Sequence, residues 1–269
     1  MRHVATEHGD VHHTQPKKFL RSKLRLVSWL GSQWTAVARF SAERLVELGV
    51  PRGRVACIGN PVPALPELDE AERKQLRLRL GIASREAWLW LHVANHRPVK
   101  DQATLLEAFA RARAASAVPL HLALLGDGPE RPRLEARAQR LGLAGSLHFL
   151  GFRGDVARWL RAGDGFALSS LSEALPMSLL EACAAGLVPV ATRVGGIPDL
   201  LRDGEQGWLV EPGDVDGLAR ALAAPARDRD ACARIARAAR ERVMREFSLD
   251  AVLDAYLALY RPAARAARR

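Results

Sequence analysis

The chain has 269 residues, of which 48% are hydrophobic, enough for one large or two modest domains with a buried core. Every apolar run is shorter than the roughly 20 residues that cross a bilayer, and residues 1–10 contain no apolar signal-peptide core. The three cysteines lie far apart, which argues against a disulfide framework or zinc site and indicates reduced thiols.

The formal net charge is +10, and nearly all of the positive charge is arginine. Two segments are locally basic, residues 17–25 and the tail 261–269. A basic, partly apolar segment suits an anionic membrane surface, whereas a GC-rich genome would explain the arginine and alanine content without any partner. Nucleic acid is not expected as a partner, because no zinc finger, helix-turn-helix or RNA-binding signature accompanies the charge.

The first sixty residues predict only a few βα units, too little for an independent domain. We expect a short strand ending at His8, a strand at 26–29, a helix over 33–48 and a strand at 55–58. The proline-rich residues 61–70 are typical of a linker.

From residue 85 onward, apolar strands alternate with segments of helical period. The predicted strands are 88–94, 120–125, 146–150, 165–169, 188–192 and 208–210. The predicted helices are 102–115, 129–141, 154–162, 176–185 and 197–202, followed by helical residues 213–245 and a last helix ending at residue 260. This pattern predicts an α/β domain with a doubly wound parallel sheet, in which ligands bind beyond the carboxyl ends of the strands.

The most informative segment, residues 172–186, lies between two of these strands. Glu173 precedes a helix and Glu181 lies two turns inside it, with Pro176 at the expected first helical position. The amides of a helix N-terminus can hold an anion while a neighbouring carboxylate binds hydroxyl groups. The alternative is a solvent-exposed Glu173 and a Glu181 paired within its helix.

Other motifs combine with this segment into a recognisable set. They are, in chain order, Thr6-Glu7-His8-Gly9, Gly59-Asn60-Pro61, Ala94-Asn95-His96-Arg97-Pro98-Val99-Lys100-Asp101, Leu125-Gly126-Asp127-Gly128-Pro129, Phe149-Leu150-Gly151, Gly195-Gly196-Ile197-Pro198 and Gly204-Glu205-Gln206-Gly207. In this order and spacing the chain resembles the family 4 glycosyltransferases of the GT-B type, which are retaining, metal-independent and use nucleotide-sugar donors. The resemblance implies a GT-B-like fold with one complete doubly wound Rossmann-like domain and a partial second one.

The resemblance also implies roles for residues around the two glutamates. Glu181 would hydrogen-bond the ribose hydroxyls, and Glu173 would lie near the donor sugar and the reacting carbon. Ala174 stands where the family usually has glycine, which the turn tolerates if its φ stays negative. The implied donor-binding residues are Gly128, Leu175, Pro176, Met177, Ser178 and Glu181.

Two cations follow the buried strand 88–94. When a nucleoside diphosphate departs, negative charge develops on its leaving oxygens. The positive charges of Lys100 and Arg97, held in fixed positions, would stabilise it. The family's arginine lies closer to the strand end, at about Asn95 here, so Arg97 is a displaced candidate. The alternative for both cations is a solvated loop.

His8 resembles the histidine of the family's amino-terminal domain that faces the donor sugar, so it is a fourth catalytic candidate beside Glu173, Lys100 and Arg97. The alternative is a surface histidine near a frayed terminus. A metal site at His8, His12 and His13 is not expected, because no carboxylate or cysteine pattern accompanies them. An NAD-type oxidoreductase is disfavoured, since the glycine fingerprint begun at 126–128 is not completed.

We expect three parts in the chain. Residues 1–62 would be the remnant of an acceptor-side Rossmann-like domain, 63–245 the nucleotide-sugar-binding domain, and 246–269 a helix and basic tail packing back toward the amino-terminal part. The family's amino-terminal domain is on the order of a hundred residues longer, which indicates a misplaced start, a fragment, or a shortened relative working with a separate protein that supplies the other half.

The expected function is transfer of a sugar from a nucleoside-diphosphate sugar to a glycan or lipid-linked acceptor, with retention and without a cofactor or metal. The alternative is a non-catalytic nucleotide-sugar-binding or interaction module. The expected location is the cytoplasm, with peripheral contact at the inner face of the plasma membrane.

Overall fold

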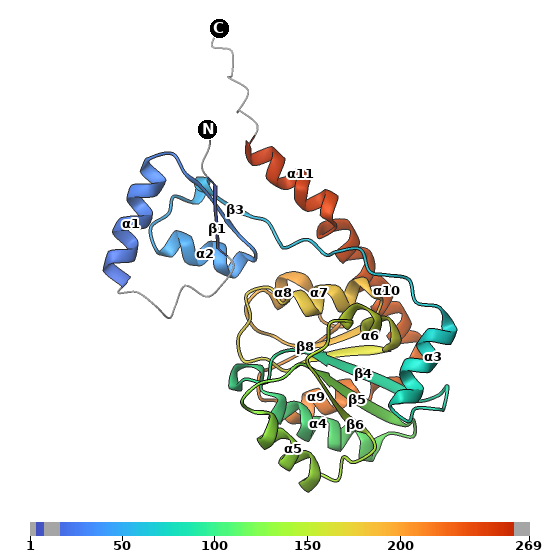
Figure 1. The fold of residues 1–269 in the computed structure, drawn as a ribbon. Helices are drawn as coiled ribbons and strands as arrows, with labels where there is room; N and C mark the ends of the chain where they lie inside the picture. Colours follow the sequence, from blue (N-terminus) through green and yellow to red (C-terminus); the bar gives the residue numbers. More distant parts are fainter. Residues whose placement is uncertain (1–3, 8–16, 261–269) are drawn as a thin grey trace.

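A computed structural model describes residues 4–7 and 17–260 of the chain. Its described part contains two parallel sheets (Figure 1). The smaller sheet has the order β1-β2-β3 and the larger the order β6-β5-β4-β7-β8-β9. In the smaller unit the elements are β1 (Val4–Glu7), α1 (Lys17–Trp29), β2 (Gln33–Ala36), α2 (Arg39–Glu47), η1 (Arg52–Arg54) and β3 (Val55–Cys57).

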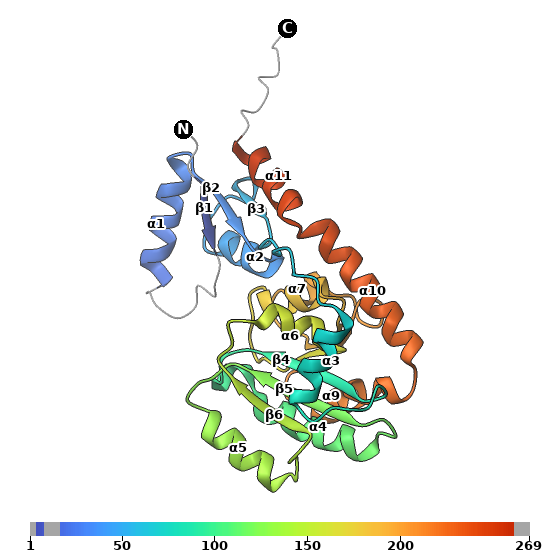
Figure 2. The ribbon, with the colours of Figure 1, turned by 45° about the vertical axis from the view of Figure 1, so that its right-hand side comes forward.

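The larger sheet carries helices on both faces, as the doubly wound prediction requires (Figure 2). Its strands are β4 (Trp88–Val93), β5 (Leu120–Leu125), β6 (Leu147–Gly151), β7 (Gly165–Leu168), β8 (Val188–Thr192) and β9 (Trp208–Val210). Its helices are α3 (Glu70–Arg79), η2 (Pro98–Lys100), α4 (Gln102–Ala115), α5 (Arg131–Arg140), α6 (Val156–Ala162), α7 (Met177–Ala184), α8 (Ile197–Leu200), α9 (Val215–Leu222), η3 (Ala224–Ala226) and α10 (Arg229–Glu246).

The largely apolar sequence of β4 is explained by burial on both of its faces. Leu89 and Leu91 pack into one core with residues of α3, α6 and α7. Trp88 and Trp90 alternate with them and pack into a second core with residues of α4, α5 and α9. Because successive side chains of a strand point to opposite faces, a strand with two cores has no polar face.

The order of the strands reverses between β4 and β7. From β4 the chain builds outward through β5 and β6, and then returns to the other side of β4 with β7, β8 and β9. All these neighbours are parallel. Such a reversal opens a crevice beyond the carboxyl ends of the two central strands, where open α/β sheets bind ligands.

The last two helices connect the two sheets. α10 packs on α7 and β8, and α11 (Leu249–Tyr260) continues toward the smaller sheet (Figure 2). The hydroxyls of Thr6 and Tyr256 are 3.5 Å apart, and the amide of Val62 donates to the carbonyl of Phe247 at 2.8 Å. Among the described residues, no helix has the length and apolar character needed to cross a bilayer.

Several expected elements of the amino-terminal part are wrong. The strand expected at 26–29 lies inside α1, and the helix expected over 33–48 is split into β2 and α2. Residues 33–36 become a strand because β1 and β3 pair with them on both sides, a non-local contact that overrides local preference. α3 was not predicted, and it begins at Glu70, the last residue of the expected linker 61–70.

Candidate functional site

Lys100 and Glu173 meet at the point where the strand order reverses. Lys100 ends the short η2 after β4, and Glu173 lies in the segment between β7 and α7. The Lys100 Nζ is 2.6 Å from the Glu173 Oε1, and the two side chains are only 20% and 9% exposed. The structure thus brings together two of the four catalytic candidates, beyond the carboxyl ends of the two central strands of the sheet.

Two serines fix this pair. The Ser170 hydroxyl donates to the same Glu173 Oε1 at 2.6 Å, and the Ser169 hydroxyl donates to the backbone carbonyl of Lys100 at 2.9 Å. Neither serine was assigned a role from the sequence. Their position directly after an apolar strand was the available signal, because polar residues at carboxyl ends of parallel strands meet at the ligand edge.

Asp101 turns the chain after Lys100. It adopts φ 43°, and it is the one described non-glycine residue with positive φ, so Ala174 keeps a negative φ as expected. The Asp101 carboxylate accepts from the amide of Thr104 at 3.3 Å and caps α4. Aspartate tolerates the left-handed region better than most residues, and the cap ties Lys100 to the start of a rigid helix.

Two glycines allow neighbouring backbone segments to touch at the site. A Cβ on Gly195 would lie 1.6 Å from the carbonyl oxygen of Glu173, and a Cβ on Gly128 would lie 2.5 Å from that of His96. The Gly196 amide donates to the Ala174 carbonyl at 2.9 Å. The Gly128 turn and the Glu173 segment therefore both depend on close packing of main chain.

α7 begins at Met177, with Pro176 at the N-cap rather than at the first helical position, since Pro176 has φ −72° and ψ 115°. The carbonyl of Pro176 accepts from the amide of Leu179 at 3.1 Å. The amides of Met177 and Ser178 come before the first helical hydrogen bond and have no partner within the helix. Leu175 is buried behind this helix start.

Glu181 lies half-buried in α7. Burial raises the pKa of its carboxyl group. It makes no hydrogen bond or ion pair with any residue that the structure describes, so the alternative of an ion pair within its helix is wrong. A half-buried carboxylate without a protein partner is suited to accept hydrogen bonds from a ligand.

Two neutral histidines lie behind the Lys100 loop. The His92 Nδ1 donates to the Ala167 carbonyl at 2.8 Å, and burial, with the nearby charge of Lys100, lowers the pKa of His92 to about 4. Burial also lowers the pKa of His96. Both rings are therefore uncharged near neutral pH, and Lys100 carries the positive charge on this side of the crevice.

An apolar cavity of about 260 Å³ lies at the carboxyl ends of β4 and β5, beside the Gly126 turn. Val93, Leu125, Val156 and Phe152 line it. Phe152 is 87% exposed, which is unusual for a phenylalanine. This cavity was not predicted from the sequence, although an aromatic residue directly after Phe149-Leu150-Gly151 was a signal.

The structure describes only one of the other two catalytic candidates. Arg97 is exposed at the N-cap of η2 and has no ion pair with a described residue. His8 lies outside the described residues.

Comparison with solved structures assigns the fold. The structure of Anabaena HepE in complex with UDP and glucose superposes with a TM-score of 0.84 and 25% identity, over 96% of this chain and 70% of that chain. Sucrose-phosphate synthase from Thermosynechococcus elongatus gives a TM-score of 0.74 at 21% identity, over 96% of this chain and 66% of that chain. The chain has a GT-B-like α/β fold.

Comparison with protein families assigns the chain to a family within this fold. The model described as "Glycosyl transferases group 1" matches residues 76–242, and the chain belongs to this family. The lipopolysaccharide core biosynthesis glycosyltransferase LpsE of Rhizobium meliloti is 40% identical over 58% of this chain and 44% of its own length. The putative colanic acid biosynthesis glycosyltransferase WcaL of Escherichia coli is 32% identical over 78% of this chain and 65% of its own length. The chain thus spans about half to two thirds of the length of these curated relatives.

Proposed function

We propose that the crevice around Lys100 and Glu173 is the donor site of a retaining glycosyltransferase that transfers a sugar from a nucleoside-diphosphate sugar to a glycan or lipid-linked acceptor. The observation that carries this proposal is the Lys100–Glu173 pair at the reversal of strand order, beside the first-turn amides of α7 that have no partner within the helix. The UDP complex of HepE and the names of LpsE and WcaL support a UDP-sugar as donor and a bacterial surface glycan as acceptor.

In this proposal Lys100 and α7 stabilise the leaving group. Lysine has three N–H donors, of which one is directed at Glu173, so the others are available to the phosphate oxygens of the donor. The bond from the anomeric carbon to the phosphate oxygen breaks, and negative charge grows on the departing diphosphate. The ammonium group and the helix-start amides of Met177 and Ser178 offset that charge.

The reaction then completes on the same face of the sugar. The acceptor oxygen bonds to the anomeric carbon, and its proton passes to the departing phosphate oxygen. Glu173, held by Ser170 and Lys100, keeps a carboxylate beside the carbon that carries positive charge in the transition state. Arg97 is exposed and free to swing toward the diphosphate, and His8 would face the sugar from the other side.

The nucleoside would lie along α7 and the apolar cavity. Glu181 would accept hydrogen bonds from the ribose hydroxyls, and the base would enter the cavity lined by Phe152 and Val93, where a flat aromatic ring buries apolar surface. The Gly128 turn would then lie beside the phosphates.

This placement of the donor assigns a role to each of the three parts of the chain. Residues 63–245 would hold the donor, 1–62 would face the acceptor, and the helix within 246–269 would link them, as the contacts of Phe247 and Tyr256 support.

Nucleotide titration and a transfer assay test the proposed function. We expect saturable UDP binding by calorimetry, and a loss of at least tenfold, about 1.4 kcal/mol, in Glu181→Ala. Glu241→Ala, which removes an exposed carboxylate from α10, should leave the affinity unchanged. Lys100→Met should abolish hydrolysis or transfer from UDP-glucose. Absence of binding to UDP, GDP and ADP would refute the donor site, and binding with no turnover would favour the non-catalytic module.

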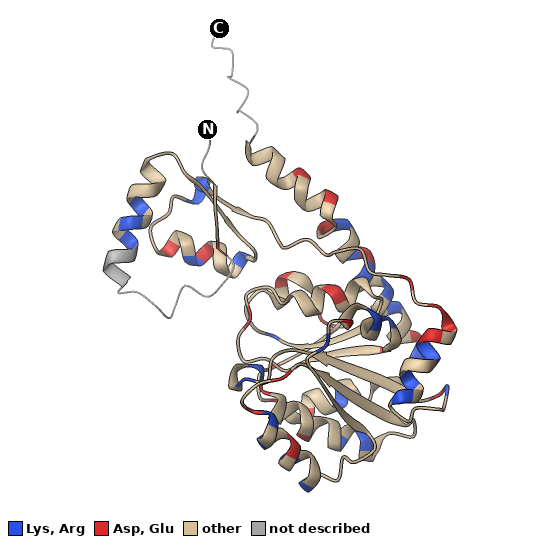
Figure 3. Cartoon of the chain, viewed as in Figure 1, with Lys and Arg blue, Asp and Glu red and all other residues tan. Residues whose placement is uncertain are grey.

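We also propose that α1 touches an anionic membrane surface. Figure 3 shows basic residues along α1, among them Arg21, Lys23 and Arg25. Trp29 is the last residue of the helix and Leu30 follows it, and their side chains are 80% and 69% exposed. Basic and aromatic side chains on one helix are typical of interfacial binding.

Vesicle sedimentation tests this contact. The protein should bind vesicles containing phosphatidylglycerol more strongly than neutral ones, and Trp29→Ser should reduce binding severalfold. Met244→Ser, which removes an exposed apolar side chain from α10, is the matched control. Equal loss in both variants, or equal binding to neutral vesicles, would contradict the proposal.

A further inference from the structure

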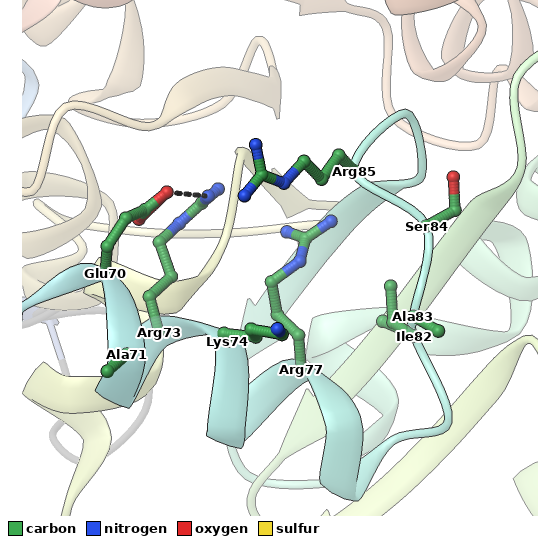
Figure 4. A pocket seen from close by; sticks show the side chains of 9 residues that line it. All are labelled: Glu70, Ala71, Arg73, Lys74, Arg77, Ile82, Ala83, Ser84 and Arg85. Carbon is green, nitrogen blue, oxygen red and sulfur yellow. Dashed lines mark ion pairs between the residues drawn. The ribbon is translucent and has the colours of Figure 1, made fainter.

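A basic cavity lies at the opposite end of the larger sheet from the donor site. It has a volume of about 480 Å³ and is formed by α3 and the segment 82–85 that leads into β4 (Figure 4). Its polar lining residues are Glu70, Arg73, Lys74, Arg77, Ser84 and Arg85. The cavity lies near the amino ends of β4 and β7, whereas Lys100 and Glu173 follow their carboxyl ends.

Arg77 and its carboxylate partner anchor one wall of the cavity. The Arg77 guanidinium donates to the Ala87 carbonyl at 2.5 Å and to the Asp164 carboxylate at 2.8 Å. Asp164 also accepts from Arg73 at 2.5 Å and from the Leu89 amide at 2.8 Å. This wall is therefore rigid and does not need a ligand to hold its shape.

Two further cations at the cavity have no such partner. Lys74 and Arg85 are exposed, and neither forms a hydrogen bond or ion pair with a described residue. The Ser84 hydroxyl accepts from the Glu86 amide at 3.1 Å, which leaves its own proton free to donate.

The charge at the cavity is not balanced. Four cations face the carboxylates of Glu70 and Asp164, so two positive charges remain. Figure 4 shows the guanidinium groups of Arg73, Arg77 and Arg85 directed into the same space. Arginine forks match the oxygens of a phosphate group, and a dianion would neutralise the excess.

We propose that this cavity binds the phosphate monoester dianion of a small phosphorylated ligand, through Lys74 and Arg85 on an arginine wall already fixed by Asp164. The site is distinct from the donor crevice. β4 has six residues between the two ends, which is roughly 20 Å of strand, so a diphosphate held at Lys100 does not reach it. The phosphate could belong to a soluble metabolite or to a lipid headgroup of the phosphatidic acid type.

Titration of the full chain with inorganic phosphate, and with vesicles containing phosphatidic acid, tests the proposal. The double variant Lys74→Gln/Arg85→Gln should weaken binding at least tenfold. The charge-matched control Arg79→Gln/Arg140→Gln removes two exposed arginines outside the cavity and should change binding less than twofold. Both pairs are exposed, so circular dichroism should show that all variants remain folded.

The outcomes separate the two sources of phosphate. Pair-dependent binding of inorganic phosphate supports a soluble ligand. Binding that depends on the pair only with phosphatidic acid vesicles supports a lipid headgroup. No saturable binding of either probe, or an equal loss in the control, would overturn the proposal, and neither result depends on whether the donor crevice binds UDP.

Discussion

Gly195 leaves the Glu173 segment no space for a side chain. Its φ is +52°, and a Cβ would lie 1.6 Å from the Glu173 carbonyl oxygen. The same carbonyl belongs to the residue whose carboxylate holds Lys100. The position of that carboxylate is therefore coupled to the absence of a side chain at Gly195, which lies beyond α7 and β8 in the sequence.

Gly195→Ala should damage both stability and the site. The left-handed backbone alone costs roughly 1–2 kcal/mol, and the forced shift of the Glu173 segment adds about 1–3 kcal/mol. Urea unfolding measures the loss of stability, and UDP-glucose turnover measures the damage to the site.

Gly204→Ala is the matched control for this substitution. Gly204 has a φ of +75° but nothing within 4 Å of an added Cβ, so only the backbone cost applies. If the two variants lose the same free energy of unfolding and Gly195→Ala keeps full activity, the coupling to Glu173 is wrong.

At this scale the sequence provided candidate residues but did not predict the contacts between them. Glu173, Lys100 and Glu181 were named from order and spacing, yet the ion pair between the first two depends on two segments 73 positions apart meeting at one strand edge. Ser170 was not assigned because a serine carries no signal for supporting a carboxylate until its neighbour is known. Arg97 was named by analogy, and its exposed position leaves its role a proposal.

Among the elements, α3, β4 and β7 are joined through one carboxylate. Asp164 precedes β7 and accepts from Arg73 and Arg77 of α3 and from the amide of Leu89 in β4. The Arg77 side chain is only 8% exposed. Removing one partner of such a buried pair leaves the other charge uncompensated.

Asp164→Ala should therefore lower the free energy of unfolding by about 3 kcal/mol. Asp216→Ala offers the comparison, because its ion pair with Arg111 joins two more exposed side chains, and such pairs contribute less than about 1 kcal/mol. Guanidinium unfolding of both variants gives the difference. Similar small losses would show that Asp164 does not anchor α3.

The elements that the sequence predicted well are those with two buried faces. The strands of the larger sheet were located because 120–125, 188–192 and 208–210 are largely apolar, and the predicted bounds of these three strands agree with the structure. α3 was missed because its sequence is largely charged, with only a few apolar positions to reveal the face packed against α6. β2 was missed because a four-residue strand is stabilised by pairing to β1 and β3 rather than by its own composition.

At the scale of the whole molecule, all four histidines in the described part of the chain are held in their neutral form. Burial lowers the pKa of His96 and His121, and lowers the pKa of His92 and His148 to about 4. The imidazole rings of His121 and His148 also stack, with a distance of 3.3 Å between the His121 Nδ1 and the His148 Nε2. Protonation of one ring therefore disfavours protonation of the other. The rest of the chain's histidines lie outside the described residues.

These lowered pKa values predict that the protein loses stability in mild acid. An unfolded histidine has a pKa near 6.5 and folded His92 one of about 4, so the unfolded state binds more protons between these values. The free energy of unfolding should have its full value above pH 6.5 and fall as the pH is lowered toward 4. His92 alone should contribute about 3 kcal/mol to this fall, at roughly 1.4 kcal/mol per pH unit. Urea unfolding between pH 7.5 and about 4.5 measures the slope. His148→Gln should make that slope shallower by up to one proton, because glutamine does not titrate, while a curve that is flat from pH 7 to 5 would contradict the neutral assignment of these rings.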